Sequence, residues 1–138
     1  MAYRAAVCDD SAADADYVRG IVAHWAEQRG VALECRAFSS AEQFLFCYAE
    51  DKNFDLLLLD VEMPGADGVT LAKTVRQENE AVQIVFITGY SDYIAEGYEV
   101  AALHYLVKPL DENKLFSVLD RAAEKLQKNE KVLHLELS

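Results

Sequence analysis

The sequence predicts an α/β fold in which five parallel strands form one sheet with helices on both faces. Short apolar runs alternate with amphipathic segments along the chain. This strict alternation is typical of parallel strands joined by right-handed helical crossovers. The runs at residues 54–59 and 82–87 are apolar on both sides. Such strands are buried on both faces, which requires helices above and below the sheet.

Five apolar runs account for the strands, in the order YRAAVC, VALECRAF, FDLLLL, VQIVFI and ALHYLV. Each is of strand length and is followed by polar residues or by a segment with helical periodicity. The predicted strands cover residues 3–8, 31–38, 54–59, 82–87 and 102–107.

Capping residues mark the predicted helices. Ser11 and Asp14 have the spacing of a capping box, and Gly30 lies where the first helix would end. Ser39 and Glu42 repeat the box before the second helix. Each pairing predicts that the serine accepts a hydrogen bond from the backbone at the start of its helix.

Apolar stripes give the faces that the helices bury. The fifth helix, opened by Asp111, has the clearest stripe, and the fourth is short and interrupted by Gly97. In chain order the stripes are Tyr17, Val18, Ile21, Val22 and Trp25; Phe44, Leu45 and Tyr48; Leu71 and Val75; Ile94 and Tyr98; and Leu115, Val118, Leu119, Ala122 and Leu126. Four phenylalanines are expected in the core, namely Phe38, Phe44, Phe46 and Phe54.

Composition predicts one domain that does not bind nucleic acid directly. The chain has 138 residues, 52% of them hydrophobic, which suffices for one well-filled core. Its net charge of −11 has the wrong sign for contact with a phosphate backbone. The cysteines lack C-x-x-C spacing, and no apolar run is long enough to span a bilayer. We therefore expect free thiols and a cytoplasmic protein without membrane contact.

The last residues differ from the rest of the chain. In "KVLHLELS", leucines alternate with polar residues as they do in a strand, yet no partner strand follows. We expect residues 1–128 to form the domain, and residues 129–138 to be a linker or the start of a further C-terminal domain.

Polar side chains follow four of the predicted strands. Asp9 and Asp10 follow the first, Asp60 the third, Thr88 ends the fourth, and Lys108 follows the fifth. Ligands of open α/β sheets bind outside the carboxyl ends of the strands. These five residues are therefore expected to share one site.

The chemistry of these residues points to a metal ion and a phosphoryl group. Neighbouring carboxylates repel one another unless a cation lies between them, and oxygen ligands without histidine or thiolate favour Mg²⁺, with Mn²⁺ possible. One aspartate can then form an aspartyl phosphate, while the ammonium of Lys108 and the hydroxyl of Thr88 stabilise the transferred group.

The motifs "VCDD", "LLLLDVEMPGADG", "ITG" and "YLVKP", in this order and spacing, resemble the receiver domain of two-component response regulators. The resemblance runs from about Tyr3 to Leu126. It implies a flavodoxin-like receiver fold with strand order 2-1-3-4-5. It also implies a signalling domain that catalyses only its own phosphorylation and dephosphorylation, with a sensor histidine kinase as phosphoryl donor.

The resemblance assigns roles residue by residue. Asp60 corresponds to the phosphoacceptor, Asp10 to a direct Mg²⁺ ligand and Asp9 to a ligand acting largely through water. Asp60 and the backbone carbonyl of Glu62 complete the protein's share of the metal site. Lys108 corresponds to the phosphoryl-binding lysine, before a peptide bond to Pro109 that is typically cis in this family.

Further positions correspond to the family's switch. Thr88 and Tyr105 match the hydroxyl and the aromatic side chain that change position on phosphorylation, and Glu62, Gly89 and Tyr90 match positions that tune phosphoryl lifetime. The surface formed by the fourth helix, fifth strand and fifth helix would then control an output domain or form a homodimer.

The run "ITGYSDYIAEGYEVAALHYLVKP" resembles receivers that precede a LytTR-type DNA-binding domain. It implies an output in transcription regulation.

Two alternatives remain open at this stage. A phosphatase of the haloacid dehalogenase type uses a similar set of groups, but its nucleophile lies in a D-x-D motif on the first strand, where this chain has Asp9 and Asp10 adjacent. A degenerate receiver would act only as a protein-interaction module and would bind no Mg²⁺.

Overall fold

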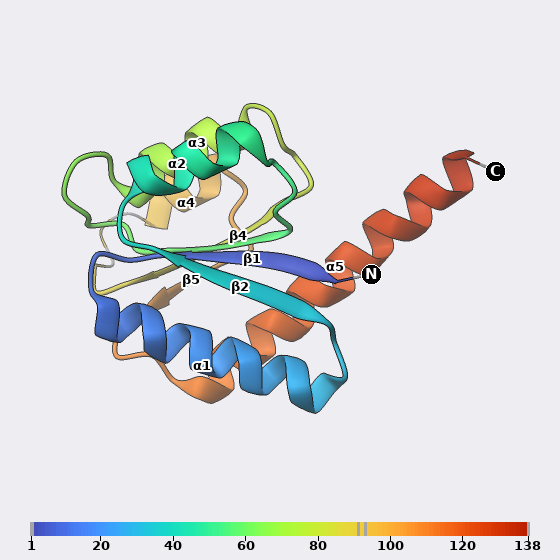
Figure 1. The fold of residues 1–138 in the computed structure, drawn as a ribbon, viewed down its shortest axis with the longest axis horizontal. Coiled ribbons are helices and arrows are strands. Elements are labelled where there is room, and N and C mark those ends of the chain that lie inside the picture. The colour runs from blue at the N-terminus through green and yellow to red at the C-terminus, as the bar shows by residue number, and fades with distance from the viewer. Residues whose placement is uncertain (1, 91, 93, 138) are drawn as a thin grey trace.

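Five parallel strands form the central layer of the computed structural model, with helices packed on either side (Figure 1). The structure describes residues 2–90, 92 and 94–137, and side chains up to residue 129. The sheet order is β2-β1-β3-β4-β5, which confirms the predicted order. The strands are β1 (Tyr3–Cys8), β2 (Leu33–Phe38), β3 (Leu56–Leu59), β4 (Gln83–Thr88) and β5 (His104–Val107).

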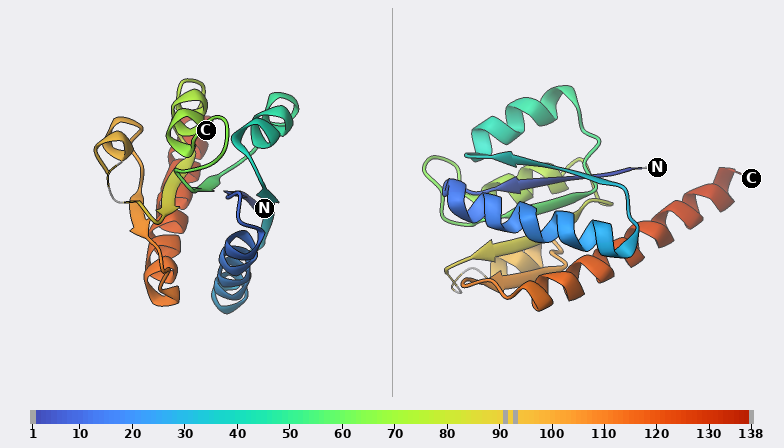
Figure 2. Two further views of the ribbon diagram at one scale, coloured as in Figure 1. Left: turned by 90° about the vertical axis from the view of Figure 1, so that its left-hand side faces the viewer. Right: turned by 60° about the horizontal axis from the view of Figure 1, so that its bottom comes forward.

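Helices α1 and α5 cover one face of the sheet, and α2, α3 and α4 cover the other (Figures 1 and 2). This arrangement confirms the predicted layers. The helices are α1 (Ala12–Arg29), α2 (Ala41–Glu50), α3 (Gly68–Arg76), α4 (Ile94–Glu99) and α5 (Glu112–Leu137).

The four leucines of β3 divide between two cores because successive strand residues point to opposite faces. Leu57 and Leu59 pack in the core beneath α2 and α3, whereas Leu56 and Leu58 pack in the core beneath α1 and α5. All four are buried, and each contributes roughly 1.5–3 kcal/mol through removal from water. The strand that precedes Asp60 is thus held from both sides.

The caps of α1 agree with the prediction except that the Ser11 N–H donates to Asp9 instead of Asp14, and those of α2 correct it. Ser11 accepts a hydrogen bond from the backbone N–H of Asp14, and Gly30 ends α1 with a φ of 64°. Helix α2, however, is capped by Ser40, whose side chain accepts from the backbone N–H of Gln43. The predicted box of Ser39 and Glu42 is therefore wrong by one residue. Adjacent serines offer the same chemistry, so the tertiary position of the helix decides between them.

Four side chains predicted to be buried are exposed instead, namely Tyr17, Phe46, Ile94 and Tyr98. Phe46 is 79% exposed and Tyr17 is 54% exposed, whereas Phe38, Phe44 and Phe54 pack together in the core. Phe46 lies on the solvent side of α2, because Phe44 and Tyr48 occupy the side that faces the sheet. The prediction that Phe46 belongs to the core is wrong.

The backbone of the C-terminal tail is helical. Helix α5 runs to Leu137 and extends beyond the sheet (Figures 1 and 2). The strand-like alternation of the leucines therefore does not produce a strand in this structure. Alternation favours a strand only where a neighbouring strand supplies hydrogen bonds, while a helix satisfies its own backbone. None of the described helices combines the length and apolar character required to cross a membrane.

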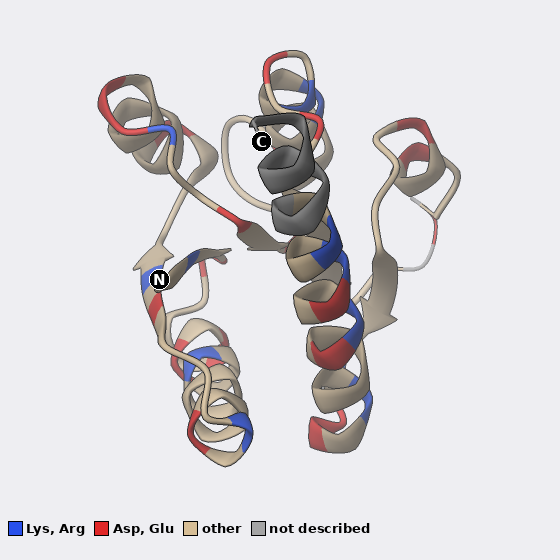
Figure 3. Ribbon diagram, turned by 90° about the vertical axis from the view of Figure 1, so that its right-hand side faces the viewer, with Lys and Arg blue, Asp and Glu red and all other residues tan. Residues whose placement is uncertain are grey.

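Asp120 links α5 to α1 through hydrogen bonds from two residues of α1. Its Oδ1 accepts from the Trp25 indole at 2.8 Å and from Arg29 Nε at 2.9 Å, and its Oδ2 accepts from Arg29 at 3.2 Å. Helix α5, which leads to the C-terminus, carries both acidic and basic residues (Figure 3). The hydrogen bonds from Arg29 and then Trp25 lower the pKa of Asp120.

A pH-dependent loss of stability is expected for Asp120→Asn. Because the pKa of Asp120 is lower in the folded protein, its contribution is present above its unfolded pKa and is lost as pH falls through the folded pKa. At pH 7 the variant should lose less than about 1 kcal/mol of unfolding free energy, as is usual for an exposed ion pair. Urea unfolding from pH 7 down to pH 2 measures the difference from wild type, which should shrink as pH falls below 4. A pH-independent difference would contradict this account.

Candidate functional site

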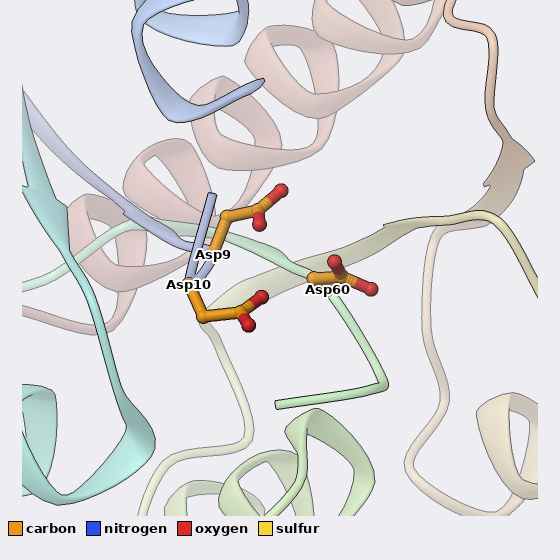
Figure 4. Close-up of side chains that lie close together, drawn as sticks. All are labelled: Asp9, Asp10 and Asp60. Atoms are coloured by element: carbon orange, nitrogen blue, oxygen red, sulfur yellow. The ribbon is translucent and has the colours of Figure 1, made fainter. Parts of the chain in front are cut away.

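Three aspartates meet at the carboxyl ends of β1 and β3. These strands are adjacent, with Cys8 opposite Leu59, so the residues that follow them are neighbours. Asp60 N–H donates to the Cys8 carbonyl at 2.9 Å, which fixes the backbone at this point. Carboxylate oxygens of Asp9, Asp10 and Asp60 lie within 4.8 Å of one another, and their side chains gather in one place in Figure 4.

Two of the three acids are buried. Asp9 is 4% and Asp60 is 8% exposed, whereas Asp10 is exposed. Burial raises the pKa of Asp9, although hydrogen bonds from Lys108 and the Ser11 backbone oppose this effect. The Asp60 Oδ1 atom is buried and has no hydrogen-bond partner among the described residues. A buried carboxylate oxygen without a partner is costly, and this oxygen-only cluster fits a hard divalent cation.

Lys108 reaches into the acidic cluster from the end of β5. Its Nζ atom lies 2.8 Å from Asp9 Oδ2 and 3.1 Å from Asp60 Oδ2. Its backbone N–H donates to the Thr88 carbonyl at 2.8 Å, and the Lys108–Pro109 peptide bond is cis. Burial acts to lower the pKa of Lys108, but hydrogen bonds to Asp14, Asp9 and Asp60 outweigh it and raise the pKa.

A chain of hydrogen bonds joins the end of β4 to β5. The hydroxyl of Thr88, which is fully buried, accepts from the backbone N–H of Tyr90 at 3.4 Å. The carbonyl of Tyr90 in turn accepts from the Tyr105 hydroxyl. The Tyr105 ring packs against Phe86 with centroids 5.7 Å apart. Tyr90 is therefore the shared neighbour of Thr88 and Tyr105.

The other two predicted site residues lie at the surface. Gly89 is exposed, and a Cβ atom at this position would meet nothing within 4 Å among the described residues. The side chain of Glu62, two residues beyond Asp60, is exposed as well.

Comparison with known proteins decides the family. The family model for the response regulator receiver domain matches residues 6–120. The chain belongs to this family. The receiver is 33% identical, over 71% of its length, to an uncharacterized response regulatory protein of Vibrio cholerae. It is 31% identical, over 72% of its length, to the sensory transduction protein LytT of Oceanobacillus iheyensis.

These relatives are longer than the receiver, which spans 38% of the first and 41% of the second. Among solved structures, the response regulatory domain of protein mrkE from Klebsiella pneumoniae has a TM-score of 0.82 at 22% identity. That match covers 91% of this chain and 98% of the other. It supports the fold described above.

One residue near the receiver's acidic cluster was not predicted. Asp14 Oδ2 lies 2.8 Å from Lys108 Nζ, although the two residues are 94 positions apart in the chain. From the sequence, Asp14 is expected only as part of the cap of α1. No local pattern indicates the contact, because it depends on how α1 packs beside the end of β5.

The loop after Asp60 is fixed from two directions. Gly68 N–H donates to the Val61 carbonyl at 2.9 Å, and Glu42 Oε2 accepts from Ala66 N–H at 3.1 Å. This bond lowers the pKa of Glu42. Glu42 thus holds the loop that follows Asp60, in place of the predicted role in the capping box of α2.

Proposed function

We propose that this receiver accepts a phosphoryl group from a sensor histidine kinase onto Asp60 in a Mg²⁺-dependent reaction. The observation that carries the proposal is the buried Asp60 carboxylate, which has Lys108 Nζ at 3.1 Å and lies beside Asp9 and Asp10. Its Oδ1 atom finds no hydrogen-bond partner in the part of the chain that the structure describes. The pocket thereby combines a nucleophilic oxygen of Asp60, the ammonium of Lys108 and further carboxylate oxygens that could hold a metal ion.

The chemical step is displacement at phosphorus. An Asp60 carboxylate oxygen forms a bond to phosphorus, and the P–N bond to the kinase histidine breaks. The electron pair of that bond stays on the imidazole nitrogen, which takes up a proton. Lys108 and the Thr88 hydroxyl donate to the transferred phosphoryl oxygens.

A divalent metal ion would complete the charge balance of this site. Asp9, Asp10, Asp60 and the backbone carbonyl of Glu62 would hold Mg²⁺, or Mn²⁺, which offsets negative charge when bound. Glu62, Gly89 and Tyr90 would set the access of water and so the lifetime of the phosphoryl group. The receiver thus catalyses only its own phosphorylation and dephosphorylation.

Thr88, Tyr90 and Tyr105 provide a route from the pocket to the surface. When Thr88 turns toward the phosphoryl group, the hydrogen bond from the Tyr90 N–H to its hydroxyl would break or lengthen. The Tyr90 backbone could then move, and with it the carbonyl that accepts from the Tyr105 hydroxyl. Phosphorylation would then shift the balance between conformations of the surface formed by α4, β5 and α5. This surface carries the exposed Tyr98 and Val107.

The output would lie outside this domain. Residues 1–128 would form the receiver, and residues 129–138 would link it to a LytTR-type DNA-binding domain that regulates transcription in the cytoplasm. The greater length of the relatives supports a further domain. The surface formed by α4, β5 and α5 would control that domain or form a homodimer. Membership in the receiver family leaves the haloacid dehalogenase alternative without support.

Incubation with acetyl phosphate and Mg²⁺ tests the proposal. We expect intact-mass analysis to show a gain of one phosphate per chain, because the P–O bond to acetate can break in place of the P–N bond to histidine. Removal of divalent metal with EDTA should abolish the gain, and added excess Mg²⁺ should restore it. Absence of both phosphate gain and Mg²⁺ binding by calorimetry would instead support the interaction-module alternative.

A further inference from the structure

We propose that Asp14 is a positioning residue that retains the Lys108 ammonium at the phosphoryl pocket when Asp9 and Asp60 are engaged in metal binding and phosphotransfer. The proposal rests on the proposed function, and extends it to a residue on α1 that belongs to neither the metal-ligand set nor the phosphoacceptor.

The ammonium of Lys108 has three hydrogen-bond donors and three carboxylate partners. It lies 2.8 Å from Asp9, 2.8 Å from Asp14 and 3.1 Å from Asp60. A lysine ammonium has three N–H groups and no acceptor, so these three contacts use its full capacity.

The three carboxylate partners of Lys108 differ in whether they also take part in metal binding or phosphotransfer. Asp9 and Asp60 are in the group whose oxygens could hold a metal ion, and Asp14 is not. Asp9 Oδ2 and Asp60 Oδ2 cannot serve a divalent cation and the ammonium equally well, and Asp60 must also form the new bond to phosphorus. Asp14 is then the carboxylate that remains with Lys108.

Lys108 needs such a partner because its side chain is partly exposed and can turn away from the acidic cluster. Its side chain is 22% exposed. Lys108 and Asp14 line a shallow cavity of about 250 Å³ between α1 and the segment after β5, together with Tyr17, Val18 and Leu110. A flexible lysine side chain gains rotamer freedom when it is released. The Asp14 carboxylate opposes that release.

Asp14 itself is well fixed for this role. It lies in the first turn of α1, and its backbone N–H is bound by the Ser11 side chain at 3.2 Å. The aspartate is also close to the positive end of the α1 dipole, which stabilises its charge. A contribution to α1 stability alone would require no contact with Lys108.

The sign of the effect separates positioning from simple electrostatics. Removal of a negative charge beside a pocket that receives an anion should speed phosphorylation if only the overall field matters. If Asp14 holds Lys108 in place, the same removal should slow phosphorylation because the ammonium leaves the pocket. Asp16 offers a matched charge on the same helix, since it is 77% exposed and its ion pair is with Arg19 at 4.0 Å.

The first measurement is the rate of phosphorylation by acetyl phosphate at saturating Mg²⁺, monitored by intact-mass analysis. We expect Asp14→Asn to slow it by about two- to fivefold, as for loss of one partly exposed ion pair. Asp14→Glu should restore most of the rate, and Asp16→Asn should leave it unchanged or slightly faster. In a Lys108→Ala background, Asp14→Asn should cause no further slowing.

A metal-free measurement gives a readout independent of activity. Urea unfolding in EDTA of wild type, Asp14→Asn, Lys108→Ala and the double variant forms a double-mutant cycle. We expect the double variant to lose less stability than the sum of the single losses. Additive losses would overturn the inference, as would an Asp14→Asn rate equal to or faster than wild type. If wild type takes up no phosphate, the proposed function itself is contradicted. If wild type takes up phosphate and Asp14→Asn is not slower, only the role of Asp14 is contradicted.

Discussion

Replacement of Asp60 by asparagine is expected to abolish the phosphate gain from acetyl phosphate. Asparagine has nearly the same size and keeps one oxygen that can accept from Lys108, which lies 3.1 Å away in wild type. Its amide lacks the anionic oxygen that attacks phosphorus. Intact mass after incubation with acetyl phosphate and Mg²⁺ should therefore show only the unmodified variant.

Asp16→Asn is the matched control for this experiment, because it removes the same charge from an exposed position on α1. It should gain one phosphate like wild type. Urea unfolding of Asp60→Asn checks that the fold is retained. A folded Asp60→Asn variant that gains one phosphate at the wild-type rate would show that another residue is the acceptor.

Gly68→Ala is expected to be strongly destabilising. A Cβ atom on Gly68 would lie 2.0 Å from the Asp60 carbonyl oxygen and 3.2 Å from the Val61 Cα atom. Both are backbone atoms, so the loop or the end of β3 must move. We expect the free energy of unfolding to fall by about 3 kcal/mol, at the upper end of the usual cost of overpacking.

The same movement should slow phosphorylation, because it displaces the backbone of the proposed phosphoacceptor. Gly20→Ala is the control: it lies within α1, and a Cβ atom there would meet nothing within 4 Å among the described residues. Alanine in a helix interior is favoured over glycine by about 0.5–1 kcal/mol, so this variant should be slightly more stable than wild type. Equal stabilities of Gly68→Ala and Gly20→Ala would contradict the close approach.

The strands could be predicted well because their signal is local. β1 has the predicted bounds, Tyr3–Cys8, and the other four strands lie within one to two residues of the predicted runs. Apolar residues on both sides of β3 require burial on both faces. The corresponding signal failed in the C-terminal tail, where the alternating leucines belong to α5.

The capping residues show where local signals become ambiguous. Ser11 caps α1 as predicted, but Ser39 and Ser40 are adjacent and only Ser40 caps α2. Glu42 then binds the backbone of Ala66, 24 residues away. The choice depends on contacts between α2 and the loop after Asp60, which no local pattern contains.

The sequence by itself determined the alternation of strands and helices, the family, and the gathering of polar residues at the ends of β1, β3, β4 and β5. Parallel strands bring their carboxyl ends to one edge of the sheet, so Asp9, Asp60 and Lys108 could be placed together from their position after each strand. Only the tertiary structure decided that Asp14 contacts Lys108. That contact depends on the packing of α1 against the sheet, which sets the position of its first turn beside β5.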